Sequence, residues 1–348
     1  MRVLMICPEL PAAETPGSMA PTARQIRSLQ TAGIDTDVVD MSGVPKLKYL
    51  MVIPKIRRLI DRCDLIHAHF GYCGWLAKLA PLGKFASKPV VMSYMGDDLL
   101  GTRKNEQGEL EWFSRVMVAA NRRLAKRVTE VIVKSQEMAA LVAPVPASVI
   151  PNGVDTSVFA PQDRQHAREQ LGLPKDQRLV LFPGNPEYAC KGYPFAANVC
   201  QRASELLGTP IRLIPLWNID PDEVAVYMNA CDAMVMTSLS EGSPNVVKEA
   251  LACNVAIAGV PVGDVEEQLA NVSGCHCLPR ETEPFANGLI DLLRHHPRSA
   301  GREAIESRQL DLPSVAERII QVYRRALQLP TLPAREPQLP SSTLNQVG

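Results

Sequence analysis

Two glutamates bracket a short Gly-Ser-Pro segment in the run Glu241-Gly-Ser-Pro-Asn-Val-Val-Lys-Glu249. An apolar strand pattern ends just before this run, and a helical pattern begins near Pro244. Ser243 is therefore predicted to cap the helix, with Pro244 in the first helical position, where no N–H is needed. No Glu or Gln stands at position 246 to complete a capping box. The first N–H groups of the helix are expected to point outward, where they and the helix dipole attract phosphate.

The two carboxylates suit the sugar part of such a ligand. Glu241 precedes the helix, and Glu249 lies inside it by about a turn and a half. A carboxylate only accepts hydrogen bonds, so it pairs well with the hydroxyls of a sugar or a ribose. The pattern predicts a diphosphate pocket with a sugar-binding group on each side. The alternative is an ordinary capped helix with one loop glutamate and one surface glutamate.

Alternating strand and helix patterns must position this run. In the first half, strands are predicted at residues 3–7, 36–40, 65–67, 89–93, 130–133 and 148–150, with helices at 21–32, 53–60, 74–82 and 111–126. The alternation restarts with strands at 178–183, 211–216, 233–237 and 255–260 and helices at 193–207, 222–230 and 244–253. Apolar strands separated by amphipathic helices are typical of parallel α/β sheets covered on both faces. Such sheets bind ligands at the carboxyl ends of their strands.

The chain divides near an Asn-Gly turn pair at residues 152–153, which is followed by a polar stretch to residue 177. We predict an N-terminal domain at residues 1–158 and a C-terminal domain at residues 159–312. A helix at residues 313–328 can pack back on the first domain. The tail at residues 329–348 is rich in Pro, Ser and Gln and is predicted to be disordered.

The composition is that of a globular protein, with 46% hydrophobic residues and 37 Lys and Arg against 37 Asp and Glu. This balance leaves no global field that would recruit nucleic acid. The first 158 residues nevertheless carry 20 basic and 15 acidic side chains, which fits an anionic partner or an ordinary solvated surface. The nine cysteines lack disulfide-framework spacing and are predicted to be buried thiols. Cys275-His-Cys277 is interpreted as a core strand, because no second pair stands at a zinc-like spacing.

Several segments besides the glutamate run resemble one family, the retaining glycosyltransferases of family 4, whose GT-B fold has two Rossmann-like parallel-sheet domains facing across a cleft. The glutamate run resembles the family signature, and residues 150–155 resemble its inter-domain segment. Residues 180–192 resemble its second phosphate loop. In the first domain, residues 65–71 and 90–98 resemble strands that end at the cleft, and residues 16–19 stand where the family has a Gly-rich loop. The resemblance spans residues 1–328 in the right order.

The resemblance implies a UDP- or GDP-sugar as donor and a hydroxyl acceptor (a glycan, a lipid-linked molecule or a small molecule). Lys191 would neutralise the leaving diphosphate, Glu241 would contact the donor sugar, and Asp97 would receive the acceptor proton or cap a helix. The other residues expected on the donor side are Glu249 for the ribose, Gly242, Ser243, Pro244, Asn245, Gly184, Asn185 and Trp217. Those expected on the acceptor side are Gly17, Ser18, Met95, Gly96 and Asp98. No metal and no other cofactor is expected, since a protein cation and a helix terminus neutralise the diphosphate.

Two positions depart from the family pattern. Asn185 stands where the family commonly has an Arg, six residues before Lys191, and Met95 stands where it usually has a His. A neutral amide brings no charge, and a thioether makes no polar contact to sugar or phosphate. Two alternatives to a fully active transferase therefore stay open. One is a catalytically weak nucleotide-sugar-binding relative or partner subunit, and the other is a nucleotide-sugar epimerase.

The expected location is the cytoplasm. The apolar run at residues 1–7 is too short for a signal peptide, and no stretch approaches the roughly 18–20 apolar residues of a membrane span. Residues 46–62 carry six basic side chains among apolar ones. This segment predicts either peripheral contact with an anionic membrane or lipid-linked acceptor, or an ordinary surface helix.

Overall fold

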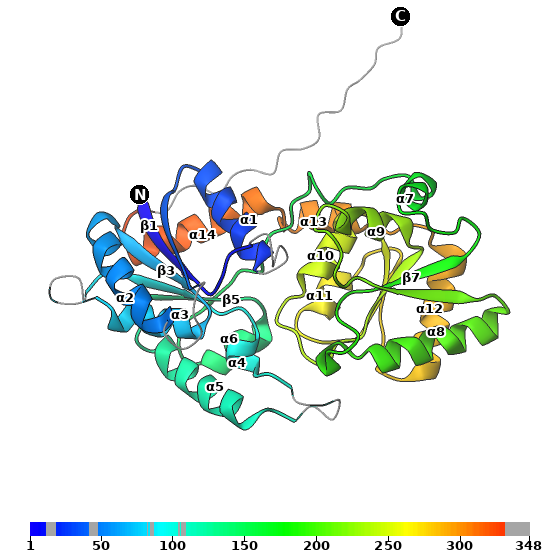
Figure 1. Cartoon of the computed structure of the whole chain (residues 1–348), viewed down its shortest axis with the longest axis horizontal. Coiled ribbons are helices and arrows are strands. Elements are labelled where there is room, and N and C mark those ends of the chain that lie inside the picture. The colour runs from blue at the N-terminus through cyan, green and yellow to red at the C-terminus, as the bar shows by residue number, and fades with distance from the viewer. Residues whose placement is uncertain are drawn as a thin grey trace, which may run out of the picture.

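The computed structural model describes residues 1–11, 19–41, 48–81, 83, 87–103, 105 and 109–330, without the side chains of residues 48–50. Within these ranges the chain forms two parallel sheets, each covered by helices, which lie beside one another (Figure 1). The predicted α/β architecture with two sheets is confirmed.

The first sheet has the strand order β2-β1-β3-β4-β5-β6. Its strands are β1 (Arg2–Cys7), β2 (Asp35–Asp40), β3 (Leu65–His69), β4 (Val90–Ser93), β5 (Glu130–Val133) and β6 (Ser148–Val149). One face is covered by α1 (Ala20–Thr31) and α14 (Leu312–Ala326), and the other by α2 (Lys48–Leu59), α3 (Gly71–Leu79) and α5 (Trp112–Ala125) (Figure 1). The short helices α4 (Asp97–Leu100) and α6 (Gln136–Val142) follow β4 and β5.

Alternate residues of the strands separate two cores in this domain. Val3 and Met5 of β1 pack with residues of α1 and α14, whereas Leu4 and Ile6 pack with residues of α2, α3 and α5. Successive side chains of a strand point to opposite faces, so a sheet buried on both faces needs continuous apolar strands. Helix α14 completes the core of the first domain although it follows the second domain in the chain.

The second sheet has the strand order β11-β10-β9-β7-β8. Its strands are β7 (Arg178–Phe182), β8 (Ile211–Pro215), β9 (Ala233–Met236), β10 (Ala256–Gly259) and β11 (Cys275–Cys277). Helices α8 (Tyr193–Leu207) and α12 (Thr282–His295) cover one face. The other face is covered by α9 (Val224–Ala230), α10 (Asn245–Ala252), α11 (Val265–Leu269) and α13 (Gly301–Ser307).

The predicted strand at residues 130–133 and the predicted helix at residues 193–207 have the bounds of β5 and α8. Helix α7 (Arg164–Gln170) lies in the polar stretch for which the sequence predicts no element. Its Arg168 is buried, because the guanidinium donates to Asp232 Oδ2 at 2.8 Å and to the carbonyl of Ala230 at 2.9 Å. An ion pair thus replaces the apolar stripe on which sequence reasoning depends.

All nine cysteines are free thiols, and all but Cys277 are buried. Cys275 and Cys277 begin and end β11, which confirms the predicted strand, although β11 is an edge strand of which only Cys275 is buried. Throughout the described ranges, no helix is both long and apolar enough to cross a membrane.

Candidate functional site

Loops at the carboxyl ends of β4 and β9 meet at the boundary between the two domains. A Cβ atom added to Gly242, which follows β9, would lie 3.4 Å from the Cα of Gly96, which follows β4. The same atom would lie 2.9 Å from the sulfur of Met138 in the first domain. The domains therefore touch at the ends of their sheets where α/β folds bind ligands.

An ion pair occupies this boundary. Lys191 Nζ donates to Glu241 Oε1 at 2.7 Å, and the two side chains are 26% and 18% exposed. Burial acts to lower the pKa of Lys191, but the charge of Glu241 and its hydrogen bond outweigh burial and raise that pKa. The alkyl chain of Lys191 runs along Gly184, where a Cβ would lie 3.2 Å from Lys191 Cγ. Gly184 also has a φ of 148°, so the loop needs glycine at this position.

Two hydrogen bonds hold the loop of Glu241 to the turn that carries Lys191. Thr237 Oγ1 donates to the carbonyl of Lys191 at 3.0 Å, and the backbone N–H of Leu239 donates to the carbonyl of Cys190 at 2.7 Å. The position of the ammonium relative to the Glu241 carboxylate is therefore set by the backbone of two strand ends. Such preorganisation is what a charge-stabilising site requires.

A second carboxylate faces this ion pair from the first domain. Burial raises the pKa of Asp97, the charge of Glu241 raises it further, and Lys191 opposes the shift. Tyr188 lies near Asp97 and Glu241. Burial raises the pKa of Tyr188 to about 12, and the negative charges of these two carboxylates raise it further. Part of Asp97 is nevertheless exposed to solvent.

The start of α10 corrects one prediction. The helix begins at Asn245, with Pro244 as its N-cap, and among the described residues no side chain caps it. The prediction that Ser243 is the cap is wrong, because its hydroxyl is used inside the protein. Ser243 Oγ accepts hydrogen bonds from Lys248 Nζ at 2.7 Å and from Gln268 Nε2 at 3.3 Å. The first N–H groups of α10 thus lack a side-chain acceptor, as a site for a phosphate requires.

Lys248 is fully buried beneath the loop of residues 241–244. Burial lowers its pKa, and the charge of Asp264 is the largest opposing influence. Its ammonium also donates to the carbonyl of Ser243 at 3.3 Å. This lysine therefore ties the loop before α10 to the helix itself.

Glu249, the next residue of α10, binds a cation from the other domain. Arg24 Nη1 of α1 donates to Glu249 Oε1 at 2.6 Å, and the side chains are 24% and 12% exposed. The guanidinium carbon of Arg24 also lies 5.2 Å from the centroid of the Phe159 ring. One carboxylate oxygen remains for a ligand hydroxyl, and the pair joins the two domains beside the site.

Matches to known proteins agree with this geometry. The model of Glycosyltransferase Family 4 matches residues 6–158, and that of Glycosyl transferases group 1 matches residues 193–295, so the two together match most of the chain. The chain belongs to the family 4 glycosyltransferases.

Curated relatives of this glycosyltransferase are distant. It is 28% identical over 240 residues to TuaC of Bacillus subtilis, whose name is that of a teichuronic acid biosynthesis glycosyltransferase. That match covers 65% of this chain, which spans 60% of the length of TuaC. The D-inositol 3-phosphate glycosyltransferase of Thermobispora bispora is 26% identical over 319 residues, which cover 77% of this chain and 72% of that protein.

Solved structures show the fold of this glycosyltransferase. Sucrose-phosphate synthase from Thermosynechococcus elongatus superposes with a TM-score of 0.73 at 17% identity, covering 94% of this chain and 99% of the other. HepE of Anabaena, in complex with UDP and glucose, superposes with a TM-score of 0.70 at 19% identity, covering 93% and 100%. The two Rossmann-like domains form the GT-B fold.

Two other predicted site residues of the glycosyltransferase, Asp98 and Asn185, accept hydrogen bonds from the backbone of their own loops. Asp98 is buried and accepts the backbone N–H groups of Met95 and Gly96 at 3.0 Å. Its carboxylate thus organises the loop that carries Asp97. Burial raises the pKa of Asp98 to about 6, while these hydrogen bonds oppose the shift. Asn185 accepts the backbone N–H of Glu187 at 2.9 Å and so shapes its own turn.

Four further residues were predicted, of which the structure describes two. Trp217 follows β8 and is 51% exposed. Asn245 is the first residue of α10, and its side-chain oxygen is buried without a hydrogen-bond partner among the described residues. Gly17 and Ser18, expected on the acceptor side, lie outside the described residues.

Sequence reasoning missed Arg24 and Lys248. Lys248 has a weak signal, since it interrupts the apolar side of a short helix between Val247 and Ala250. Arg24 has none, because nothing in α1 indicates that a residue 225 positions away completes its hydrogen bond. The contact of Arg24 arises only when distant segments meet, whereas Lys248 bonds Ser243 five residues before it.

A buried polar group lies behind the site in the first domain. His67 Nδ1 is 2.6 Å from the hydroxyl of Tyr323 in α14, and His67 Nε2 is 2.7 Å from Ser93 Oγ. Lys134 is buried and donates to the carbonyl of Ile150 at 3.3 Å. Burial lowers the pKa of Lys134 to about 7, and the charge of Lys248 adds to this shift. The histidine and Tyr323 fasten α14 to the first sheet.

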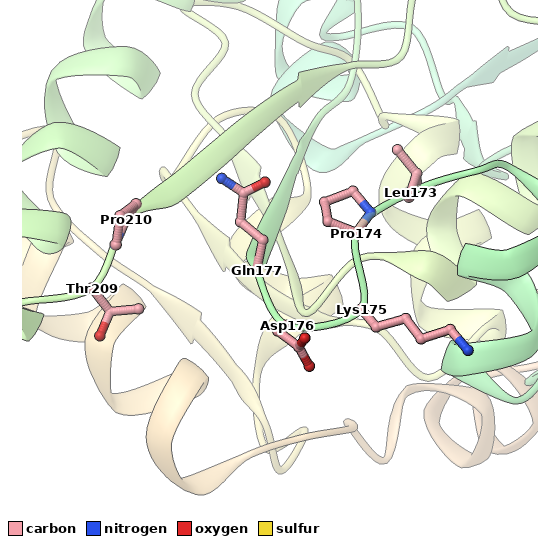
Figure 2. Close-up of a pocket in the computed structure, with 7 residues that line it drawn as sticks. All are labelled: Leu173, Pro174, Lys175, Asp176, Gln177, Thr209 and Pro210. Atoms are coloured by element: carbon pink, nitrogen blue, oxygen red, sulfur yellow. The ribbon is translucent and has the colours of Figure 1, made fainter.

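A surface hollow of about 780 Å³ lies elsewhere (Figure 2). It is lined by Leu173, Pro174, Lys175, Asp176, Gln177, Thr209 and Pro210. These residues precede β7 and β8, so the hollow is at the amino ends of the strands, opposite the site. No group of three or more His, Cys, Asp or Glu side chains that could hold a metal ion occurs within the described ranges.

Proposed function

We propose that the chain is a retaining glycosyltransferase that uses a UDP- or GDP-sugar as donor and a hydroxyl group as acceptor. The observation that carries the proposal is the Lys191–Glu241 ion pair, 2.7 Å long, in the loops beside the uncapped end of α10. An ammonium and free N–H groups favour a diphosphate, and the carboxylate favours the hydroxyls of the attached sugar.

The donor would lie along α10. Its diphosphate would accept the backbone N–H groups of Gly242, Ser243 and Asn245, with Lys191 as counter-charge. Its ribose hydroxyls would donate to Glu249, whose second oxygen is not used by Arg24. Support comes from HepE, which shares the fold and was solved with UDP and glucose. Trp217 would border the base.

The reaction breaks the bond between the anomeric carbon and the diphosphate oxygen, and the bonding electrons leave with the diphosphate. Lys191 would stabilise this departing anion, while Glu241 would hold the sugar hydroxyls near the developing positive charge of the ring. The acceptor oxygen then attacks the anomeric carbon from the side of the leaving group, which retains the configuration. Its proton would pass to the diphosphate or to Asp97, whose raised pKa favours taking up a proton.

The same charges support a reaction that needs no metal ion. Lys191 and the N-terminus of α10 supply positive charge where other transferases use a divalent cation. We therefore propose that the donor needs no metal ion.

A catalytically weak nucleotide-sugar-binding protein is the second candidate. It is favoured by Asn185, whose side-chain oxygen is used in its own turn and which brings no charge to the phosphate loop. Under this candidate the donor binds through Glu249 and α10, but the bond to the diphosphate is not broken at a useful rate.

One experiment separates the two candidates. The protein is incubated with UDP-, GDP- and ADP-sugars, and binding and slow release of free nucleotide are both measured. A transferase releases nucleotide, and Lys191→Ala and Glu241→Ala abolish the release. The matched controls are Lys175→Ala and Glu169→Ala, which break an exposed ion pair of the same domain and should change nothing. Tight donor binding without release, across a broad acceptor panel, favours the second candidate.

A further inference from the structure

Three neighbouring helices of the first domain have an unusual charge composition. Helices α2, α3 and α5 together contain eight Lys or Arg residues and no Asp or Glu. Helices α8 and α12 of the second domain carry both signs. In Figure 1, α2, α3 and α5 lie along the side of the first sheet opposite α1 and α14. We call the outer surface of α2, α3 and α5 the basic face.

Side-chain contacts join the three helices into one surface. Arg57 of α2 donates through Nε to the carbonyl of Ala80, the residue after α3, at 2.9 Å. The guanidinium carbon of Arg127, just after α5, lies 5.7 Å from the centroid of the Trp75 ring in α3. These contacts hold the three helices side by side, so their outer sides form one surface. Its acidic neighbours at the margin are Glu109 and Glu111 before α5, Asp61 after α2, and Asp40, whose Oδ1 is 4.0 Å from Lys55 Nζ of α2.

Large apolar side chains are also exposed on these three helices. Trp112, Phe113 and Val116 of α5 are 74%, 64% and 51% exposed, and Leu79 of α3 and Met51 of α2 are each 66% exposed. A single exposed apolar residue needs no explanation. Five of them on three adjacent helices whose charged residues are all basic form the pattern of a surface that lies in a membrane interface.

We propose that the basic face binds the surface of a membrane that contains anionic lipids, with the rings of Trp112 and Phe113 inserted among the headgroups. Anionic headgroups complement the charge of all three helices. Trp is enriched at membrane interfaces, and both rings bring a large apolar area. A protein partner would favour an apolar patch with charges at its rim, because the centres of protein interfaces are depleted in charge. Here cations and apolar groups are interleaved.

The basic face reaches the edge of the candidate site. Burial raises the pKa of Tyr188 to about 12, and the charges of Asp97 and Glu111 add to the effect. Glu111 therefore lies near the second-domain loop of Tyr188, and Trp112 is the next residue along the chain. Binding to a membrane through Trp112 places the donor site near the lipid surface.

Residues 46–62, which include α2, predict either peripheral membrane contact or an ordinary surface helix. The aromatic anchors lie on α5, far away in the sequence, so the surface exists only in the folded domain. The inference goes beyond glycosyl transfer, since a surface that binds lipid does not depend on the activity of the site.

Vesicle sedimentation tests the proposal with the full chain. The wild-type protein should bind phosphatidylcholine vesicles that contain phosphatidylglycerol, should be released by salt, and should not bind phosphatidylcholine alone. Arg122→Gln with Arg123→Gln should weaken binding about 30-fold, at about 1 kcal/mol for each basic side chain. Trp112→Ser with Phe113→Ser should weaken it by at least about 10-fold.

A matched control changes the same kinds of residue on the second domain. Arg212→Gln with Leu206→Ser removes one exposed basic and one exposed apolar side chain there and should leave vesicle binding unchanged. Nucleotide release from a soluble donor is measured for every variant without vesicles. This measurement tests the proposed function and the integrity of the fold independently of vesicle binding. The proposal is overturned if the wild-type protein does not bind acidic vesicles at low salt or binds neutral vesicles equally well. It is also overturned if the α5 variants bind acidic vesicles as tightly as the wild type does.

Discussion

Replacing Lys191 by methionine removes the only charge of that side chain while keeping its length. In the structure the ammonium is 2.7 Å from Glu241 Oε1 and about one quarter exposed. At that distance, with an effective dielectric constant of about 20, two unit charges attract by about 6 kcal/mol before the cost of desolvation. Loss of one preorganised donor to a departing anion costs about 3–4 kcal/mol, so kcat should fall on the order of 10²–10³-fold.

The same variant should change the pH dependence of the residual activity. Lys191 holds down the pKa of Asp97, which burial and Glu241 raise. Without the ammonium that pKa rises further, so the acid limb of the rate profile should move to higher pH. The assay is nucleotide release at saturating donor, measured across pH for the wild type and the variant.

Lys175→Met is the matched control, because Lys175 pairs with Glu169 in an exposed ion pair of the same domain. Exposed pairs contribute little, so this control should keep wild-type kcat. A loss below about tenfold, which is about 1.4 kcal/mol, in Lys191→Met would refute the role of the ammonium. An equal loss in the control would refute it as well.

Four further outcomes follow from the contacts of the site. Gly184→Ala places a Cβ 3.2 Å from Lys191 Cγ at a φ of 148°, so the melting temperature should fall by an amount that reflects about 1–3 kcal/mol, with slower nucleotide release. Lys248→Met takes a donor from Ser243 and the nearby positive charge from the buried Asp264, so the KM for the donor should rise roughly tenfold and urea unfolding should show a clear loss of stability. Lys134 has a folded pKa of about 7 and an unfolded value of about 10.4, so the unfolded chain binds more protons between those values and wild-type stability should rise with pH across that window. Lys134→Met should be more stable than wild type at about pH 7, and urea titrations in which the difference does not shrink by about pH 10 would contradict this. EDTA should leave nucleotide release unchanged, and loss of release that added Mg²⁺ restores would contradict the proposed metal independence.

Local patterns were sufficient for most of the strands, for several long helices and for the position of the main motif. The strand at Glu130–Val133 and the helix at Tyr193–Leu207 follow from apolar runs and helical periodicity, which depend on neighbouring residues alone. The same reasoning missed α7, whose Arg168 is buried through an ion pair with Asp232, 64 positions along the chain. Charge pairing across such a separation leaves no periodic signal.

For the run Glu241–Glu249, too, one part of the prediction was confirmed and another was wrong. Its residue types predicted a helix whose first N–H groups are free, and α10 begins without a side-chain cap. The predicted cap residue was wrong, since Ser243 turns inward to Lys248 and Pro244 occupies the cap position. A hydroxyl can accept a hydrogen bond from a backbone N–H or from a side-chain ammonium, and only the packing around it selects between them.

The sequence by itself determined two parallel α/β domains, their family and the segment Glu241–Glu249, because these depend on residue types at short spacing. Tertiary structure alone decided that Lys191 pairs with Glu241, that Arg24 crosses the domain boundary to Glu249, and that α14 completes the core of the first domain. The partners in these contacts are separated along the chain by 50 positions, by 225 positions and by more than 200 positions, respectively. Their partners are chosen by how the sheets face one another, and no local pattern along the chain encodes that choice.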